Sequence, residues 1–186
     1  MYKPLKYSIV VLLVLLISFA SISTSTVSIS AQEAPAKVAP ITPNAPTPAK
    51  QSVVDYLDSQ YYRIETVKNL AYKWAELGLK EFKTSDLYVQ ECIKEGFTVT
   101  RPFAGMPTAF MAQWGSGKPV IGFLVELDAL PIVSNVTAGA SGHGCGHSNF
   151  AMCMYGGFGL KYAMEKYGIK GTVRIFGTPA EETLYG

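Results

Sequence analysis

Apolar side chains recur every three or four residues over the first part of the chain that can fold. Between Val53 and Leu79 they mark the buried face of one long amphipathic helix. A second helix is expected to start at residues 84–86, Thr-Ser-Asp, whose side-chain oxygens can accept hydrogen bonds from free amides. It runs to Glu95, with Gly96 as its left-handed end. The pattern therefore predicts two helices before any strand.

The period then changes to short runs of β-branched and aromatic residues, separated by turns that contain glycine and proline. These runs predict strands over 97–100, 108–114 and 120–127. The third run, Val-Ile-Gly-Phe-Leu-Val-Glu-Leu, is almost continuously apolar, as in a strand that is covered on both faces. We therefore expect it to be a central strand of the sheet.

A helix and a fourth strand follow the third run. Ser148 or Asn149 can cap a helix to Tyr167, and residues 172–177 form the next predicted strand. Three glycines within this helix lower its intrinsic stability, so close packing on a sheet must compensate. If the two strands are parallel neighbours, both end at one edge, where open α/β sheets place their sites. The predicted fold class is α/β, with a mixed, mostly parallel sheet flanked by helices.

Residues 1–31 have the composition of a signal peptide or an N-terminal anchor. Lys3 and Lys6 precede an apolar run over 9–17, and Ser18-Phe19-Ala20 offers the small residues of a signal-peptidase site. The run is short for a membrane span, which needs ~20 apolar residues, although the Ser/Thr tract after it leaves an uncleaved anchor as the alternative. We expect export to the periplasm or the extracellular side, with any membrane contact made through this leader.

Residues 32–51 are rich in proline and alanine, and such a segment stays extended and cannot bury a core. We assign it to a linker and residues 52–186 to one folded domain. The chain is 48% hydrophobic and 16% charged, which is typical of globular proteins. Removal of the first 20 residues takes Lys+Arg from 16 to 14, equal to the 14 Asp+Glu. No positive excess remains to attract nucleic acid.

The candidate chemistry is concentrated in a glycine-rich loop, Gly-His-Gly-Cys-Gly-His at 142–147, which holds both histidines of the chain. Cys145 and His147 are two residues apart, so their side chains point the same way in a locally extended loop. A thiolate with an imidazole suits a hydrolytic centre of zinc, cobalt or manganese. The loop lacks the Gly-x-Gly-x-x-Gly spacing and the Gly-Lys-Ser/Thr ending, which disfavours phosphate binding.

Two further loops supply carboxylates. Asp128 follows the third predicted strand, and Glu181 and Glu182 follow the fourth. Because adjacent side chains point differently, one glutamate can hold metal while the other holds the attacking water and transfers its proton. Asp128 would lie behind the site and orient a ligand. A metal lowers the pKa of its water towards ~7, and a second one polarises the carbonyl, so amide hydrolysis is the expected reaction.

The sulfur and nitrogen groups also have other interpretations. The three cysteines are too few for a disulfide framework, although a bridge between Cys145 and an otherwise buried Cys153 is an alternative to metal binding. Redox chemistry at Cys145 is a third possibility. A structural zinc site normally needs four Cys or His ligands, and the spacing of the remaining cysteines does not provide them. His143 could bind metal, contact substrate or brace the loop through a backbone hydrogen bond, and we favour the brace.

Taken together, these motifs resemble the M20 family of metallopeptidases and amidohydrolases, and within it the aminobenzoyl-glutamate utilisation protein B-like and aminoacylase-like branch. The resemblance covers about residues 53–186. It rests on five motifs in the order of the family: Ala-Glu-Leu-Gly at 75–78, Ala-Gly-Met-Pro-Thr-Ala-Phe at 104–110, Asp-Ala-Leu-Pro at 128–131, the glycine-rich loop at 142–147, and Gly-Thr-Pro-Ala-Glu-Glu-Thr at 177–183.

The resemblance implies a zinc-peptidase-like catalytic domain with two divalent metal ions, zinc or manganese. Cys145, His147 and Glu182 match metal ligands, and Glu181 matches the general base. Glu126 stands where the peptidase branches carry a ligand histidine, which points to the amidohydrolase side of the family. The implied substrates are small molecules: N-acyl or aminobenzoyl amino acids and related dipeptides.

Family members continue beyond the last motif with another ligand histidine, a smaller domain used for dimerisation and lid contacts, and a late histidine. We therefore expect residues 52–186 to be the N-terminal part of such a catalytic domain, inactive alone, with a homodimer for the complete protein. The alternative is a non-catalytic remnant that acts at most as a binding module through an exposed sheet edge. Ser148 stands where the family usually carries Asp or Asn after the last histidine of the loop.

Overall fold

The computed structural model describes residues 46–183. The predicted leader at 1–31 and most of the predicted linker at 32–51 lie outside this range. Within the range, none of the helices combines the length and the apolar character that crossing a membrane requires.

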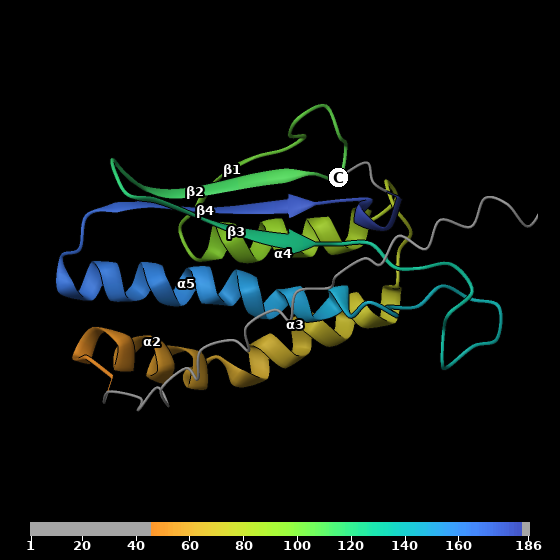
Figure 1. The fold of residues 1–186 in the computed structure, drawn as a ribbon, viewed down its shortest axis with the longest axis horizontal. Helices are drawn as coiled ribbons and strands as arrows, with labels where there is room; N and C mark the ends of the chain where they lie inside the picture. Colours follow the sequence, from red (N-terminus) through yellow and green to blue (C-terminus); the bar gives the residue numbers. More distant parts are fainter. Residues whose placement is uncertain (1–45, 184–186) are drawn as a thin grey trace, which may run out of the picture. The chain divides into compact units, whose positions relative to one another are not determined.

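One four-stranded sheet carries its helices in layers on one face (Figure 1). Helices α4 and α5 pack directly against the sheet, and α2 and α3 pack against α5. The elements in chain order are α2 (Pro48–Ser59), α3 (Tyr61–Trp74), α4 (Phe82–Lys94), β1 (Thr98–Thr100), β2 (Phe110–Ser116), β3 (Val120–Glu126), α5 (Phe150–Tyr167) and β4 (Gly171–Thr178). The predicted α/β class is confirmed.

The strand order is β1-β2-β4-β3. Strand β2 pairs antiparallel with β1 and with β4, while β3 and β4 are parallel. The sheet is thus mixed, as predicted, but the prediction that it is mostly parallel is wrong for the described residues, where only β3 and β4 pair in parallel. The crossover from β3 through α5 to β4 is present. Because Glu126 pairs with Thr178, the two strands end together at one edge.

The prediction of a central third strand is wrong for the described sheet, because β3 lies at its edge. Val125 is fully buried and Phe123 contacts the helix layer, whereas Ile121 and Leu124 are 42% and 60% exposed. A continuously apolar strand leaves apolar side chains on whichever face is not covered. The sequence pattern alone could not distinguish these two arrangements.

The single helix predicted over 53–79 is two helices with a break at Gln60. The first begins at Pro48, within the predicted linker, where the Thr47 side chain accepts a hydrogen bond from a first-turn amide. The second ends before Ala75, which has a left-handed backbone with φ 41°. Both helices pack against α5, so the apolar period continues across the break and concealed it.

Helix α4 begins before the residues that were predicted to cap it. Instead, the Thr84 hydroxyl donates to the Glu76 carboxylate at 2.9 Å, and the Ser85 hydroxyl donates to a backbone carbonyl at 2.7 Å. Gly96 lies just beyond the helix with φ 82°, as predicted. The helix end was therefore predicted correctly, and the start was not.

The glycines of α5 allow the close packing that the sequence required. A Cβ atom added to Gly157 would lie 3.0 Å from Ile175 in β4, and one added to Gly159 would lie 2.9 Å from Val53 in α2. Helix α5 is therefore in close contact with the sheet on one side and with α2 on the other. This burial compensates for the low helix propensity of glycine.

A buried carboxylate joins the helix layers. Glu91 of α4 is 3% exposed and accepts hydrogen bonds from Arg63 Nε at 2.7 Å, Lys94 Nζ at 2.9 Å and Tyr155 Oη at 2.7 Å. Burial acts to raise the pKa of Glu91, but the bonds from Lys94, Tyr155 and Arg63 together hold that pKa below its ordinary value. Its charged form therefore stabilises the fold.

We expect Glu91→Gln to lower the free energy of unfolding at neutral pH by about 2 kcal/mol. This is less than the ~3–5 kcal/mol of a fully buried pair, because water reaches Arg63 and Lys94. A depressed folded-state pKa stabilises above the unfolded-state pKa of ~4.3, and this stability is lost as the pH falls through the folded-state value. Urea unfolding between pH 7 and pH 3 should thus show a flatter pH profile for the variant.

The exposed Glu165, which pairs with Lys161 on the surface of α5, provides the control. Glu165→Gln should change stability by less than about 0.5 kcal/mol and leave the pH profile unchanged. Parallel acid profiles for Glu91→Gln and the wild type would contradict the assignment of this linkage to Glu91.

Candidate metal centre

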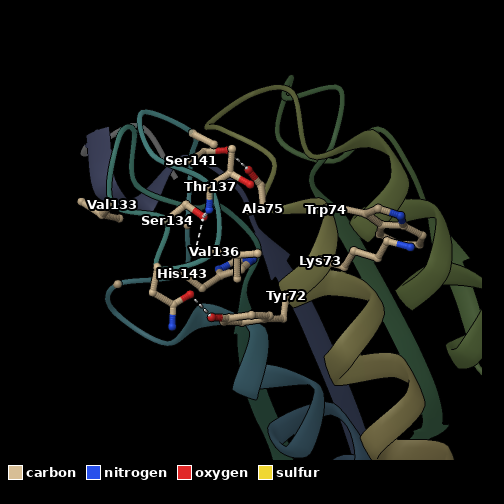
Figure 2. Close-up of a pocket in the computed structure, with 14 residues that line it drawn as sticks. Tyr72, Lys73, Trp74, Ala75, Val133, Ser134, Val136, Thr137, Ser141 and His143 are labelled. Atoms are coloured by element: carbon tan, nitrogen blue, oxygen red, sulfur yellow. Dashed lines mark hydrogen bonds between the residues drawn. The ribbon is translucent and has the colours of Figure 1, made fainter.

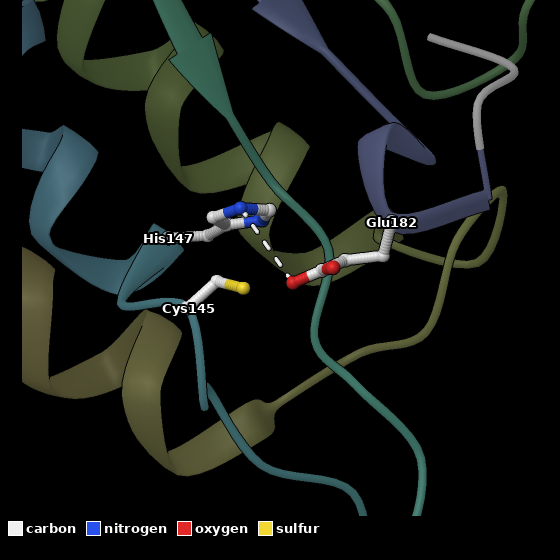
Figure 3. A group of neighbouring side chains, drawn as sticks. All are labelled: Cys145, His147 and Glu182. Atoms are coloured by element: carbon white, nitrogen blue, oxygen red, sulfur yellow. Dashed lines mark ion pairs between the residues drawn. The ribbon is translucent and has the colours of Figure 1, made fainter. Parts of the chain in front are cut away.

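Three loops meet where β3 and β4 end (Figure 3). Glu126 ends β3 and Asp128 follows it, the segment after β4 carries Glu181 and Glu182, and the glycine-rich loop before α5 carries Cys145 and His147. The crossover from β3 through α5 to β4 brings the first two loops together because parallel neighbours end at the same edge.

Two sets of potential metal ligands share His147. The Cys145 Sγ, a ring nitrogen of His147 and a carboxylate oxygen of Glu182 all lie within 4.8 Å of one another, and Glu126, His147 and Glu181 form a second such group. His147 Nε2 is 3.0 Å from Glu126, 3.6 Å from Glu181 and 3.7 Å from Glu182. The structure thus brings the predicted ligands together, and their binding of metal remains a prediction.

The imidazole of His147 is held with one nitrogen facing the carboxylates. His147 is 4% exposed, and its Nδ1 lies 2.8 Å from the Asp128 carbonyl oxygen and 3.2 Å from Asp128 Oδ1. A carbonyl oxygen can only accept, so Nδ1 carries a proton, while Nε2 faces the carboxylates and is the ring nitrogen that can bind a metal once it holds no proton. The tautomer with its proton on Nδ1 is the one in which a histidine binds metal through Nε2.

Asp128 connects all three loops. It is 1% exposed, and besides its contact with His147 it accepts the backbone N–H of Glu181 on Oδ1 at 3.2 Å and that of Glu182 on Oδ2 at 3.1 Å. Its carboxylate therefore fixes the imidazole and the two glutamates relative to each other. This geometry suits the orienting role predicted for Asp128.

The donor set is strongly acidic and suits a divalent cation. Burial raises the pKa of Glu126, His147 opposes this shift, and Glu181, Asp128 and Glu182 reinforce it. A hydrogen bond to Glu182 is the main cause that raises the pKa of the Cys145 thiol. Within residues 46–183 the ion pairs of these carboxylates are formed with His147 and not with lysine or arginine. A bound cation would offset this repulsion and favour the thiolate.

His143 and the other cysteines lie apart from these ligands. The Nε2 atom of His143 is 3.1 Å from the Ala71 carbonyl, and its ring stacks on Tyr72 with centroids 6.3 Å apart. This is the geometry of the brace that the sequence favoured. The cysteines are free, so the structure contains no Cys145–Cys153 bridge. Cys153 is exposed, contrary to its predicted burial, because it lies on the open side of α5.

A cavity of about 640 Å³ lies beside the glycine-rich loop, between the end of α3 and residues 133–144 (Figure 2). Tyr72 borders it and donates a hydrogen bond to Asn135 at 2.7 Å, and Ser141 donates to the Ala75 carbonyl at 2.6 Å. Its lining includes His143 and Gly144 but none of the residues of the two ligand groups around His147. The cavity and the candidate metal centre are therefore separate features.

Glu126 was assigned no ligand role of its own from the sequence, whereas the structure places it against His147 at 3.0 Å. A signal was present, since Glu126 and Asp128 alternate along an extended segment that ends at the predicted site. The carboxylates of the half-buried Glu76 and the fully buried Glu81 were also missed. Both lie in a charged stretch of the kind that usually faces solvent, and only the tertiary structure shows their hydrogen bonds to backbone amides.

No family model matches the chain. The chain is 35% identical over 138 residues to a subunit of the p-aminobenzoyl-glutamate hydrolase of Escherichia coli K12, a match that covers 69% of this chain and 29% of that protein. It is 29% identical over 146 residues to the Xaa-Arg dipeptidase of Mus musculus, covering 72% of this chain and 32% of that protein.

Among solved structures, the chain is similar to the YXEP protein of Bacillus subtilis, a dinuclear metal-binding peptidase of the M20 family. The TM-score is 0.57 at 24% identity, and the match covers 69% of this chain and 38% of that one. The chain thus spans roughly 30% of the length of the curated relatives it matches, with 29% and 32% for the two proteins above.

Proposed function

Since this chain belongs to the M20 family and is similar to aminobenzoyl-glutamate utilisation protein B, we propose that it forms part of a metal-dependent amidohydrolase. The complete enzyme would cleave the amide bond of N-acyl or aminobenzoyl amino acids, or of dipeptides. The observation that carries the proposal is the convergence of Cys145, His147 and Glu182 within 4.8 Å at the edge where β3 and β4 end.

The residues of this chain divide the work of hydrolysis between them. Cys145, His147 and Glu182 would hold divalent metal, with zinc and manganese as the proposed ions. Bound divalent ions supply Lewis acidity towards the scissile carbonyl and lower the pKa of water. The Glu181 carboxylate, 43% exposed and next to His147, would accept a proton from the attacking water and pass it to the leaving amine.

The proposed substrates come from the relatives. Aminobenzoyl-glutamate and dipeptides each contain one amide bond and are small enough for a site at a sheet edge. We further propose that the complete protein forms a homodimer and that residues 1–31 direct its export or anchor it in a membrane. A test for the leader is N-terminal sequencing of the protein recovered from an expressing cell.

A metal titration tests the main proposal. The 186-residue chain should bind Co²⁺ with a thiolate-to-cobalt absorption band, weakly and without hydrolysing substrate. A chimera that adds the C-terminal two thirds of the Escherichia coli relative should bind more tightly and release p-aminobenzoate from aminobenzoyl-glutamate. Absence of both cobalt binding and hydrolysis in the chimera would refute the proposal, provided that it is folded by circular dichroism.

A second candidate function is a non-catalytic binding module. It is favoured by the edge strand β3, where Val120, Ile121 and Leu124 are 49%, 42% and 60% exposed and could pair with another strand. This function predicts that Leu124→Lys abolishes association with a partner while metal plays no part. The cobalt titration therefore separates the two candidates.

A further inference from the structure

The segment that joins α3 to α4 contacts two of the three loops of the candidate metal centre. Its Glu76 carbonyl accepts the N–H of Ala129 at 2.8 Å, next to Asp128. Its Gly78 lies so close to the loop after β4 that an added Cβ atom would be 3.1 Å from the Cα of Ala180. Residues 76–81, called here the support segment, therefore pack against the loops that follow β3 and β4.

One side chain of the support segment reaches into the loop that carries the glutamates. Glu81 is fully buried, and its Oε1 accepts the backbone N–H of Ala180 at 2.9 Å and that of Leu79 at 3.0 Å. Its Oε2 accepts the hydroxyl of Thr108 at 2.8 Å. These partners within residues 46–183 are all uncharged, so three neutral donors stabilise this buried carboxylate.

The two amides that share Oε1 belong to residues with left-handed backbones. Leu79 has φ 61° and Ala180 has φ 58°, and neither residue is a glycine. Residues with a Cβ atom adopt this conformation only where their surroundings impose it. Glu81 supplies that constraint at both places with a single oxygen atom.

Ala180 directly precedes the two glutamates of the site. Its amide is held by Glu81, and the next two amides, of Glu181 and Glu182, are held by Asp128 at 3.2 Å and 3.1 Å. Three consecutive N–H groups thus point into two buried carboxylates. The direction in which the chain leaves Ala180 decides where the Glu181 and Glu182 side chains lie relative to His147.

We propose that Glu81 is a positioning residue: by holding Ala180 in its left-handed conformation, it sets the two glutamates at the metal centre. This inference rests on the proposed function in one respect, because its test by Co²⁺ binding requires that the site binds metal. It goes beyond that function because Glu81 belongs to neither ligand group and its hydrogen bonds go to Leu79, Thr108 and Ala180. It predicts that the contribution of Glu182 to metal binding depends on a side chain behind it.

Two substitutions at Glu81 separate positioning from burial. Glu81→Ala removes the acceptor, and we expect it to weaken Co²⁺ binding by at least about tenfold and to speed amide exchange of residues 180–182 by a similar factor. Glu81→Gln keeps one acceptor oxygen for Ala180 and Leu79, and the Thr108 hydroxyl can turn to accept from its amide. It should bind Co²⁺ within about threefold of the wild type.

A double-mutant cycle distinguishes positioning from general destabilisation. Glu182→Gln should weaken Co²⁺ binding strongly in the wild type and by at least about tenfold less in the Glu81→Ala background. Glu91→Ala, which changes another buried carboxylate whose hydrogen-bond partners lie on helices, is the matched control and should leave the Glu182→Gln effect unchanged. If Glu81→Ala does not fold, Glu81→Asp replaces it, since the shorter side chain cannot reach both amides.

The outcomes separate this inference from the proposed function. If the wild type binds no Co²⁺, the proposed metal site is wrong, and amide exchange at 180–182 still decides the role of Glu81. Faster exchange in Glu81→Ala, or in Glu81→Asp, with protection retained in Glu81→Gln would support positioning. The inference would be overturned if Glu81→Ala left amide exchange at 180–182 unchanged and the effects of Glu81→Ala and Glu182→Gln on Co²⁺ binding were additive. It would also be overturned if Glu81→Gln lost as much Co²⁺ affinity and amide protection as Glu81→Ala.

Discussion

Replacement of His147 by asparagine is expected to weaken Co²⁺ binding by more than about 100-fold. His147 Nε2 lies 3.0 to 3.7 Å from Glu126, Glu181 and Glu182 and belongs to both candidate ligand groups. An asparagine amide can still donate a hydrogen bond to Asp128 in place of Nδ1. The variant therefore removes the metal-binding Nε2 atom and keeps the hydrogen bond to Asp128. Since loss of an outer partner alone costs about 10- to 100-fold, loss of a shared ligand should exceed that range.

The chain contains a matched control in its other histidine. His143→Gln retains a nitrogen that can donate to the Ala71 carbonyl, and His143 is absent from both ligand groups. It should bind Co²⁺ within about threefold of the wild type in the same absorption titration. Equal Co²⁺ affinities for His147→Asn and the wild type would show that the metal lies elsewhere. A large loss of Co²⁺ affinity in His143→Gln would indicate that His143 is itself a ligand.

The position of the candidate centre could be predicted because it depends on connectivity. The run ending at Glu126, the helix after the glycine-rich loop and the strand ending at Thr178 make one crossover, and parallel neighbours must end at the same edge. Local spacing then placed Cys145 and His147 on that edge. Neither the crossover nor the spacing of Cys145 and His147 depends on which other strands complete the sheet.

The features that the sequence did not reveal depend on burial. The apolar period runs through Gln60, because both flanking helices face α5, and the apolar run of β3 is the same at an edge as at a centre. A charge in a polar stretch, such as Glu81, suggests an exposed surface. Its burial follows from where Ala180 and Thr108 lie in the fold, which are contacts between distant parts of the chain.

The second large effect is expected at Asp128. Asp128→Ala should lower Co²⁺ affinity by about 10- to 100-fold, because His147 loses one partner that orients its ring. The amides of Glu181 and Glu182 also lose their acceptor, at about 1–3 kcal/mol for each group left without one. Their partial exposure allows water to replace part of the loss, so urea unfolding of the metal-free chain should show about 3 kcal/mol less stability.

The Asp128 prediction concerns orientation, so the more conservative variant gives its sharpest test. Asp128→Asn keeps Oδ1 for His147 and Glu181, but turns an amide nitrogen towards the N–H of Glu182, where two donors then face each other. It should therefore retain most of the imidazole orientation and move Glu182, with cobalt affinity between those of the wild type and Asp128→Ala. Asp86→Ala, at an exposed aspartate, controls for the loss of a charge and should change neither quantity. If Asp128→Ala unfolds at the same urea concentration as Asp86→Ala and binds Co²⁺ equally well, then Asp128 does not connect the three loops, and the alignment of His147 with the glutamates must come from other contacts.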